Sequence, residues 1–190
     1  YLKELEKEQM TSLYLDIELP LTSVLADMEY NGVFVDKEIL KDMALSVKIK
    51  LEMISKDIFD CAGEKFNISS PLQLGNILFG KLGLPGGKKN SRGFKTDIKV
   101  LHRLYNEHQI VPRILEYRNL DKLYSTYLEG LDKFIGTDNK IHTIFKQNLT
   151  RTGRLSSVEP NIQNIPVREE EGRKIRKAFL PSPNSIFLCA

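Results

Sequence analysis

The amino-acid sequence predicts an α+β fold that is mainly α, with long helices followed by the first strands of an antiparallel sheet. Residues 36–62 and 112–135 carry apolar side chains every three or four positions, which is the repeat of one buried helix face. From Ile141 the period shortens, with Thr143 and Phe145 at every second position, as in a half-buried strand. This change indicates a helical part that precedes a part built on strands.

The first two helices have recognisable ends. Residues 19–30 form an amphipathic pattern, and Gly32 is a typical helix stop. Asp36 is a good N-cap for the long helix of residues 36–62, because its carboxylate can accept hydrogen bonds from the free N–H groups of the first turn. Gly63 follows the last apolar residue of the pattern and is expected to end this helix.

Two shorter helices are expected in the middle of the chain. Ser70 is followed by a proline and then by Gln73, which is a capping box with Pro at the first helical position. A helix should therefore begin there and end near Lys81. Thr96 precedes another amphipathic run, residues 98–105, and is a plausible cap for it.

A basic loop, residues 84–93, lies between these two helices and contains Lys88, Lys89 and Arg92. Each flanking helix presents free backbone N–H groups at its start, so the loop and the helix ends together favour a phosphate contact. A surface hairpin with no ligand is the alternative. This is not a nucleotide-binding P-loop, because Leu82 stands where the first Gly of that motif belongs and Lys89 where its Ser or Thr belongs.

The charge is unevenly distributed along the chain, although the net charge is only +3. Residues 1–29 hold two Lys and seven acidic residues, whereas residues 81–103 hold seven Lys or Arg and one Asp. Residues 146–177 hold eight basic and four acidic residues. This distribution fits a polyanionic partner, and a solvated basic surface is the alternative.

Neither a metal site nor a catalytic nucleophile is indicated. Cys61 and Cys189 stand near no second Cys or His at ligand spacing, and the three histidines are scattered, so we expect neither zinc nor disulfides. Closely spaced carboxylates such as Glu170 and Glu171 fit solvated charge better than a metal site. The chain has no apolar run of membrane length. We therefore expect no membrane partner. The absence of a disulfide pattern leads us to expect a reducing cytoplasm.

Polar residues are densest in residues 150–157 and 160–168, which carry arginines, hydroxyls, side-chain amides and prolines. A packed helix or strand could not satisfy so many hydrogen-bond donors internally. DNA could, because phosphate oxygens accept hydrogen bonds and the minor groove presents acceptors at every base pair. The segment therefore favours a DNA contact.

This segment reads T-R-T-G-R-L-S-S and then P-N-I-Q-N-I-P-V-R, and it resembles the one that opens the palm of family A DNA polymerases, the bacterial DNA polymerase I type. Further stretches resemble the thumb of that family, and the likeness covers residues 17–190. An ordered series of matches is far more specific than a single short motif. In chain order these stretches are residues 18–21, 28–33, 66–70, 82–85 and 116–123.

The resemblance implies a division of the chain. Residues 1–18 would be the tail of a preceding exonuclease-like domain, residues 19–138 the helical thumb, and residues 139–190 the N-terminal part of the palm. Residues 186–190 resemble the strand that leads to the first metal-binding aspartate. The catalytic aspartates would then lie beyond residues 1–190, so the two Mg²⁺ ions and the dNTP would bind only in the intact polymerase. We expect residues 1–190 alone to be inactive and to hold no cofactor.

The resemblance also implies DNA-binding residues. Arg154 would lie in the minor groove near the primer terminus, and Gln163 and Asn164 would sense base-pair shape. Asn161 either joins them or holds the loop by bonding the backbone. Thr152, Ser156 and Ser157 either touch phosphates or cap turns. Further contacts are expected from Arg168, from Arg118, Lys122 and Ser125 on one helix face, from Asn67, Ser69 and Ser70, and from Lys88, Lys89, Arg92 and Thr96.

The favoured hypothesis is therefore the DNA-gripping part of a DNA-directed DNA polymerase that acts in replication and repair. Its partner would be primer-template DNA, in the bacterial cytoplasm at the nucleoid. Two alternatives remain. One is a free-standing, non-catalytic module that binds duplex DNA, and the other is a helical domain that binds protein.

Overall fold

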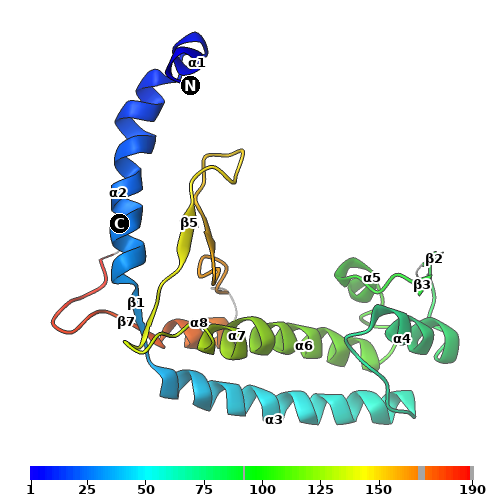
Figure 1. Cartoon of the computed structure of the whole chain (residues 1–190). Helices are drawn as coiled ribbons and strands as arrows, with labels where there is room; N and C mark the ends of the chain where they lie inside the picture. The colour runs from blue at the N-terminus through cyan, green and yellow to red at the C-terminus, as the bar shows by residue number, and fades with distance from the viewer. Residues whose placement is uncertain (92, 167–169, 189–190) are drawn as a thin grey trace. The chain divides into compact units, whose positions relative to one another are not determined.

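The computed structural model describes residues 1–91, 93–166 and 170–188 and consists mostly of helices, with three small antiparallel sheets (Figure 1). It therefore has the α+β, mainly α fold that the sequence predicts. The chain divides into two compact units. One is Asp42–Leu128, and the other combines Tyr1–Lys41 with Glu129–Ala190.

The long helix α3 runs from Lys37 to Ala62. Asp36 caps it as expected, since its Oδ1 accepts hydrogen bonds from the N–H groups of Glu38 and Ile39, at 3.0 and 3.2 Å. The helix also ends where the sequence predicts, because Gly63 has φ +72°, the left-handed conformation that typically follows the last helical residue.

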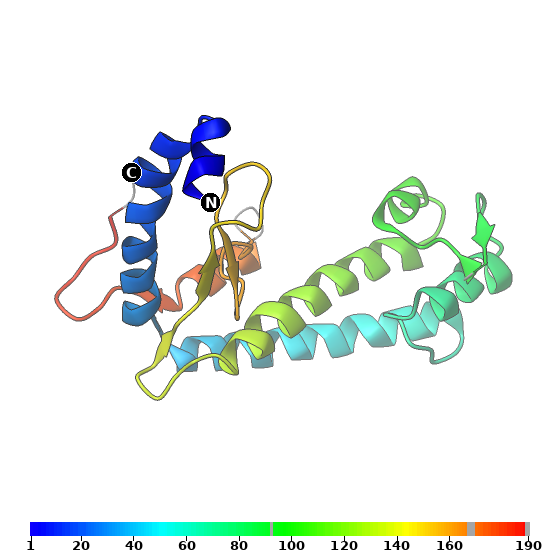
Figure 2. The ribbon, with the colours of Figure 1, turned by 45° about the horizontal axis from the view of Figure 1, so that its top comes forward.

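The unit Asp42–Leu128 is built on α3 and α6, which lie side by side (Figures 1 and 2). Helix α6 spans Ile110–Leu123 and continues as a π-helical turn, η3, over Tyr124–Leu128. Ile58 and Ile114 are fully buried, and Arg113 Nε lies 3.6 Å from Asp57 Oδ2. The predicted helix 112–135 is thus present, and it continues through the short helix α7, Glu129–Asp132, in the other unit.

Short elements close one end of this unit: α4 (Pro71–Gly75), η2 (Asn76–Lys81), the hairpin β2 (Lys89–Asn90) and β3 (Gly93–Phe94), and α5 (Ile98–Arg103). The hairpin packs on α4 through Phe94. A Cβ on Gly75 would come within 2.8 Å of the Phe94 Cβ, so this close approach needs glycine. The rings of Phe79 and Phe94 are 5.1 Å apart.

Two predicted caps differ in detail. Ser70 Oγ accepts from the N–H of Gln73 as expected, but Gln73 Oε1 accepts from the N–H of Asn67 instead of returning to Ser70. The prediction that Thr96 caps the helix at residue 98 is wrong. Asp97 caps α5 through its Oδ1 and the N–H of Val100, because Thr96 is buried and bonded to Arg118.

The second unit begins with α1 (Leu2–Lys7), a π-helical segment η1 (Leu13–Glu18) and α2 (Leu19–Asn31). The N–H of Leu19 donates to the carbonyl of Tyr14, five residues earlier, and the next residue, Pro20, has no N–H to donate. The predicted helix 19–30 is confirmed, and helical turns precede it directly.

Two antiparallel sheets complete this unit. One has the order β4 (Lys140–Ile141), β1 (Val33–Val35) and β7 (Phe179–Leu180). The other pairs β5 (Ile144–Lys146) with β6 (Ser156–Val158). The expected continuous strand over 141–145 is therefore wrong. It breaks at the buried Thr143, whose hydroxyl lies 3.0 Å from the carbonyl of Val158 and 2.8 Å from that of Pro160.

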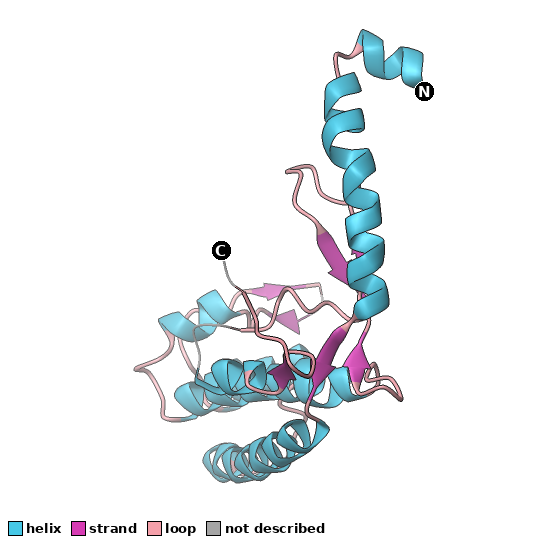
Figure 3. Ribbon diagram, turned by 90° about the vertical axis from the view of Figure 1, so that its left-hand side faces the viewer, coloured by secondary structure: helices cyan, strands magenta, loops and turns pink. Residues whose placement is uncertain are grey.

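The last part of the unit differs from the sequence prediction. Helix α8, Glu170–Arg176, leads into β7, which takes the free edge of β1 (Figure 3). The apolar run at residues 186–190 was expected to form a strand. Its described part, residues 186–188, forms none, and Ile186 and Leu188 are 85% and 90% exposed. No neighbouring strand bonds this stretch in the described part of the chain, and a strand needs one.

Candidate nucleic-acid interface

The loop of residues 147–155 joins β5 to β6 and presents Arg154 to solvent. Thr150 Oγ1 donates to the carbonyl of Arg154 at 2.6 Å and so closes the loop on itself. Thr152 is exposed within the loop, and Ser156 is half-buried in β6 opposite Lys146. The backbone of this loop is thus held from within, while the side chains of Thr152 and Arg154 are exposed.

The following turn, residues 157–165, is organised by Ser157, which is fully buried. Ser157 Oγ accepts from the N–H of Ile162 at 3.0 Å, and Ser157 N–H donates to Gln163 Oε1 at 3.0 Å. Asn161 Oδ1 accepts from the N–H of Gln163 at 3.1 Å. Asn161 thus makes a backbone bond of the loop-holding kind considered for it.

The turn leaves specific groups exposed. Gln163 uses its oxygen to hold Ser157, so its amide NH₂ is the part of the side chain still suited to an external acceptor. Asn164 is also exposed. Sequence reasoning could not decide whether Ser157 touches phosphate or holds a turn, and its burial decides for the turn. Arg168 lies outside the described residues.

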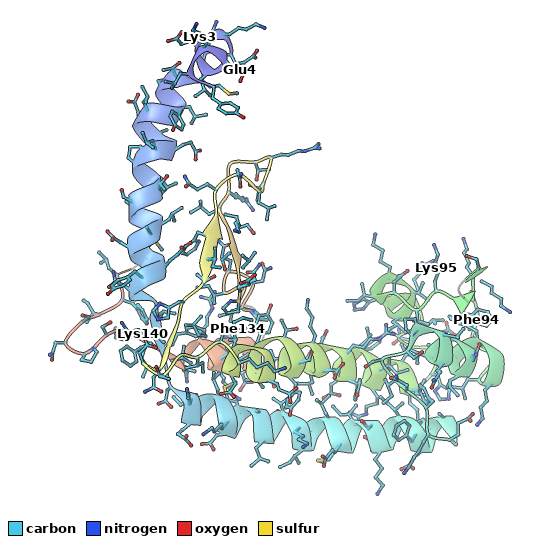
Figure 4. The ribbon with its side chains drawn as sticks, viewed as in Figure 1. Lys3, Glu4, Phe94, Lys95, Phe134 and Lys140 are labelled. Atoms are coloured by element: carbon cyan, nitrogen blue, oxygen red, sulfur yellow. The ribbon has the colours of Figure 1, made fainter. Side chains whose placement is uncertain are left out.

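A second group of predicted residues meets in a cavity of about 650 Å³ at the end of the unit Asp42–Leu128. Phe94 and Lys95 mark this end in Figure 4. The cavity brings together Ser69, Thr96 and Arg118, which are far apart in the sequence. It is lined by Ser69, Pro71, Phe94, Lys95, Thr96, Asp97, Arg118 and Asp121.

Arg118, which lines this cavity, is half-buried. Its guanidinium donates to the carbonyl of Thr96 and, at 3.3 Å, to the Thr96 hydroxyl. Burial lowers the pKa of Arg118 from its ordinary value, but an arginine remains charged at neutral pH. Two of its five N–H groups are thus engaged within the protein, and the others remain for an anion.

The acidic groups of the cavity are engaged by neighbouring donors. Asp97 caps α5, and Asp121 Oδ2 accepts from Ser69 Oγ at 3.1 Å. Asn67 Oδ1 in turn accepts from the N–H of Ser69 at 3.0 Å. Lys95, Asp97 and Asp121 were not selected from the sequence. The position of Lys95 next to Thr96 in the basic stretch 81–103 was the signal that could have found it.

The other predicted residues that the structure describes do not line the cavity. Lys122 is exposed, and Ser125 turns its hydroxyl to its own helix, 2.7 Å from the carbonyl of Asp121. Lys88 and Lys89 are exposed in the hairpin, with Lys89 Nζ 5.6 Å from the centre of the Phe94 ring. Arg92 lies outside the described residues. The hydroxyl of Ser70 is engaged as a helix cap.

No group of three or more His, Cys, Asp and Glu that could hold a metal ion occurs among the described residues. His142 has a structural partner on each side, with Nδ1 2.7 Å from the carbonyl of Glu29 and Nε2 3.0 Å from Asp138 Oδ2. The hydrogen bond to the Glu29 carbonyl is the larger cause that raises the pKa of His142, and the hydrogen bond to Asp138 is the next. Within the part of the chain that the structure describes, no helix combines the length and apolar character that crossing a membrane requires.

Comparison with known sequences places both polar regions within one family. A sequence model of DNA polymerase family A matches residues 37–190. The chain is 52% identical over 185 residues to the DNA polymerase I of Lactococcus lactis subsp. cremoris (strain MG1363), covering 97% of this chain and 21% of that protein. It is 51% identical over 180 residues to the DNA polymerase I of Geobacillus stearothermophilus, covering 94% and 20%. The chain thus spans about a fifth of the length of these relatives.

The fold agrees with these matches. The POL domain of Pol1 from M. smegmatis, solved in complex with DNA primer-template and dNTP, superposes with a TM-score of 0.88 and 37% identity. The match covers 94% of this chain and 32% of that one. Because the family model spans most of the sequence and the relatives are half identical across nearly all of it, this chain belongs to DNA polymerase family A.

Proposed function

We propose that this chain is the DNA-gripping part of a DNA-directed DNA polymerase. The observation that carries the proposal is the loop of residues 147–155, whose backbone is closed by the Thr150–Arg154 hydrogen bond while Arg154 itself is exposed. A guanidinium held out on an internally braced loop is suited to a partner rich in acceptors. The Pol1 domain that resembles this chain was solved with primer-template DNA, which supports DNA as the partner.

In this proposal Arg154 reads the minor groove near the primer terminus. Purine N3 and pyrimidine O2 accept hydrogen bonds at similar places in every base pair, so an arginine there is blind to sequence and sensitive to pair shape. Gln163 and Asn164 contact the minor groove as well, and Asn161 holds Gln163 in place by accepting a hydrogen bond from its N–H. Thr152 and Ser156 contact the phosphates that flank the groove, and a further DNA contact is proposed for Arg168.

The cavity around Arg118 takes the DNA backbone at a second place. Lys95 and Arg118 supply positive charge, and Ser69 and Thr96 supply hydroxyls. Further contacts with the DNA backbone are proposed for Asn67, Ser70, Lys88, Lys89, Arg92, Lys122 and Ser125. Such contacts depend strongly on salt because bound phosphates release counterions. In family terms, residues 19–138 would be the thumb, residues 139–190 the start of the palm, and residues 1–18 the tail of an exonuclease-like domain.

Nucleotide transfer itself is proposed to need groups outside residues 1–190. The reaction uses two Mg²⁺ ions that activate the primer hydroxyl and neutralise charge on the transferred phosphate. The aspartates that hold these ions, and the dNTP site, would belong to the intact polymerase, and the segment alone would add no nucleotides. A chromosomal DNA substrate implies action in the bacterial cytoplasm.

The test compares two arginines of the same loop in the full-length polymerase. Arg154→Ala should lower the single-turnover extension rate by about 100-fold, since a small misplacement of the primer end costs rate steeply, and should change the Kd for primer-template much less. Arg151→Ala removes the same charge from an exposed neighbour and is the matched control. Equal losses in the two variants, or equal losses in rate and affinity for Arg154→Ala, would refute the proposed role.

A further inference from the structure

Gln147, the first residue of the loop that carries Arg154, is hydrogen-bonded to the start of α2. Its Nε2 lies 3.1 Å from the carbonyl of Glu18 and 3.0 Å from Glu18 Oε2. Its Oε1 lies 3.4 Å from the hydroxyl of Thr22. One half-buried amide thus donates twice across more than a hundred residues of sequence.

The strand before the loop is tied to the same helix at its other end. Glu29 Oε1 accepts from the N–H of Phe145, and the Glu29 carbonyl meets His142 Nδ1 at 2.7 Å. Strand β5 lies beside α2 in Figures 1 and 2, and all these residues belong to one compact unit. The helix therefore fixes β5 both before the loop and at the residue where the loop begins.

From Gln147 the constraint reaches Arg154 over a short distance in the chain. Lys146 pairs with Ser156 in the β5–β6 ladder, and Thr150 Oγ1 binds the carbonyl of Arg154. A shift of Gln147 away from Glu18 would move the base of the loop on one side only. The loop would then tilt, and the Arg154 side chain would tilt with it.

From these contacts we infer that Gln147 is a positioning residue, which holds the loop of residues 147–155 against Glu18 and thereby aims Arg154 at the primer end. The inference rests on the proposed role of Arg154 in DNA contact. An amide is needed at position 147 because its NH₂ group donates to both the carbonyl and the carboxylate of Glu18. The single proton of the Thr22 hydroxyl has the Glu18 carbonyl as its nearer acceptor, at 3.1 Å. A glutamate has the same shape but offers only acceptors.

The experiment uses the full-length polymerase and a pair of reciprocal substitutions. Q147E places a carboxylate against Glu18 and should lower the single-turnover extension rate by about tenfold, with the Kd for primer-template changed less than about twofold. E18Q/Q147E should recover part of that rate, because the amide introduced at position 18 can donate to the new carboxylate, while the main-chain carbonyl of residue 18 stays without the donor that Gln147 gave it. Q147M, which neither donates nor accepts, should lose rate as Q147E does without adding charge.

The matched control is N148D, which makes the same amide-to-acid change at the next residue, an exposed one. It should lose less rate than Q147E. An equal loss would show that added negative charge in the loop is the cause, and it would overturn the inference. Failure of E18Q/Q147E to exceed Q147E would overturn the direct pairing of residues 18 and 147.

The outcome can be separated from that of the proposed function by measuring R154A in the same assay. If R154A lowers the rate and both Q147E and Q147M keep the wild-type rate, the role of Arg154 stands and the positioning inference fails. If R154A itself keeps the wild-type rate, the proposed function of the loop fails. Should Q147E reduce folding, hydrogen exchange of Q147M decides, since faster amide exchange confined to residues 147–155 is expected, and unchanged exchange there would overturn the inference.

Discussion

Arg118 and Arg154 lie in two polar regions of the chain and use their guanidinium groups in opposite ways. Arg118 is half-buried and donates two hydrogen bonds to Thr96, which connect α6 to the residues between β3 and α5. Arg154 is exposed on a loop whose backbone is braced by Thr150. An arginine that is bonded within the protein contributes mainly to stability, whereas an exposed arginine is available to a ligand. Substitution of Arg118 should therefore affect stability more, and substitution of Arg154 should affect function on DNA more.

The largest effect on stability is expected for Arg118→Ala. It removes two hydrogen bonds from a charged donor and leaves the buried Thr96 without them, which should cost about 2 kcal/mol of unfolding free energy. Arg154→Ala should change that free energy by less than about 0.5 kcal/mol, as surface substitutions usually do. Denaturant unfolding of both variants measures the difference, and similar costs would erase the distinction between the two arginines.

Next in size is Ser157→Ala, which tests the turn beside Arg154. The substitution leaves the N–H of Ile162 without its acceptor in a buried site, and should cost about 1 kcal/mol. Because the turn carries Gln163 and Asn164, primer extension should fall as well. Ser156→Ala, in the half-buried neighbouring position, is the control, and an equal loss of stability there would argue against a special role for Ser157.

The sequence anticipated these regions unequally. The polar motif of residues 150–168 was predicted to carry more donors than a packed helix or strand could satisfy, and Arg154 is indeed exposed, whereas Ser157 is buried. The cap at Asp36 and the stop at Gly63 were predicted because they depend on contacts within one helical turn. Thr96 was misjudged because its partner Arg118 is 22 residues away, and local spacing carries no sign of such a contact. For the same reason Gln147 was missed, since its partners Thr22 and Glu18 are 125 and 129 residues away.

A smaller effect is expected from pH at the base of β5. Both ring nitrogens of His142 face acceptors, the Glu29 carbonyl and Asp138, so the pKa of His142 is raised above its ordinary 6.5. A raised pKa stabilises the fold below 6.5, and this contribution is lost as the pH rises through the higher folded value. The pKa of Asp138 is lowered from 3.8, so its contribution is lost as the pH falls through the lower folded value.

Stability from this pair should therefore be greatest between about pH 4 and 6.5 and decline on the alkaline side. Because the ring and the carboxylate are both partly exposed, salt will weaken the effect. Nuclear magnetic resonance titration of His142 provides the direct measurement, with Asp138→Asn as the comparison. A folded pKa at or below 6.5 in the wild type would contradict the geometry.

The smallest effect on stability is expected for the exposed hairpin. Replacing both Lys88 and Lys89 by Ala should leave the unfolding free energy within about 0.5 kcal/mol. DNA affinity should lose salt dependence, by about 0.9 in the slope of log K against log salt for each phosphate contact removed. An unchanged slope would exclude the hairpin from the DNA contact and leave the Arg118 cavity as the candidate at this end of the unit.

The connection between α2 and β1 limits how this part of the polymerase can vary. Gly32 has φ +60°, and a Cβ there would lie 2.8 Å from the His142 ring and 2.9 Å from the carbonyl of Ile141. Any other residue would meet both the backbone conformation that disfavours side chains and a collision. A mutational library at position 32 should therefore return glycine alone among active clones, whereas the exposed helix residues just before it should tolerate wide replacement. Gly32 therefore fixes the position at which α2 ends, and substitutions on the exposed surface of α2 should leave this position unchanged.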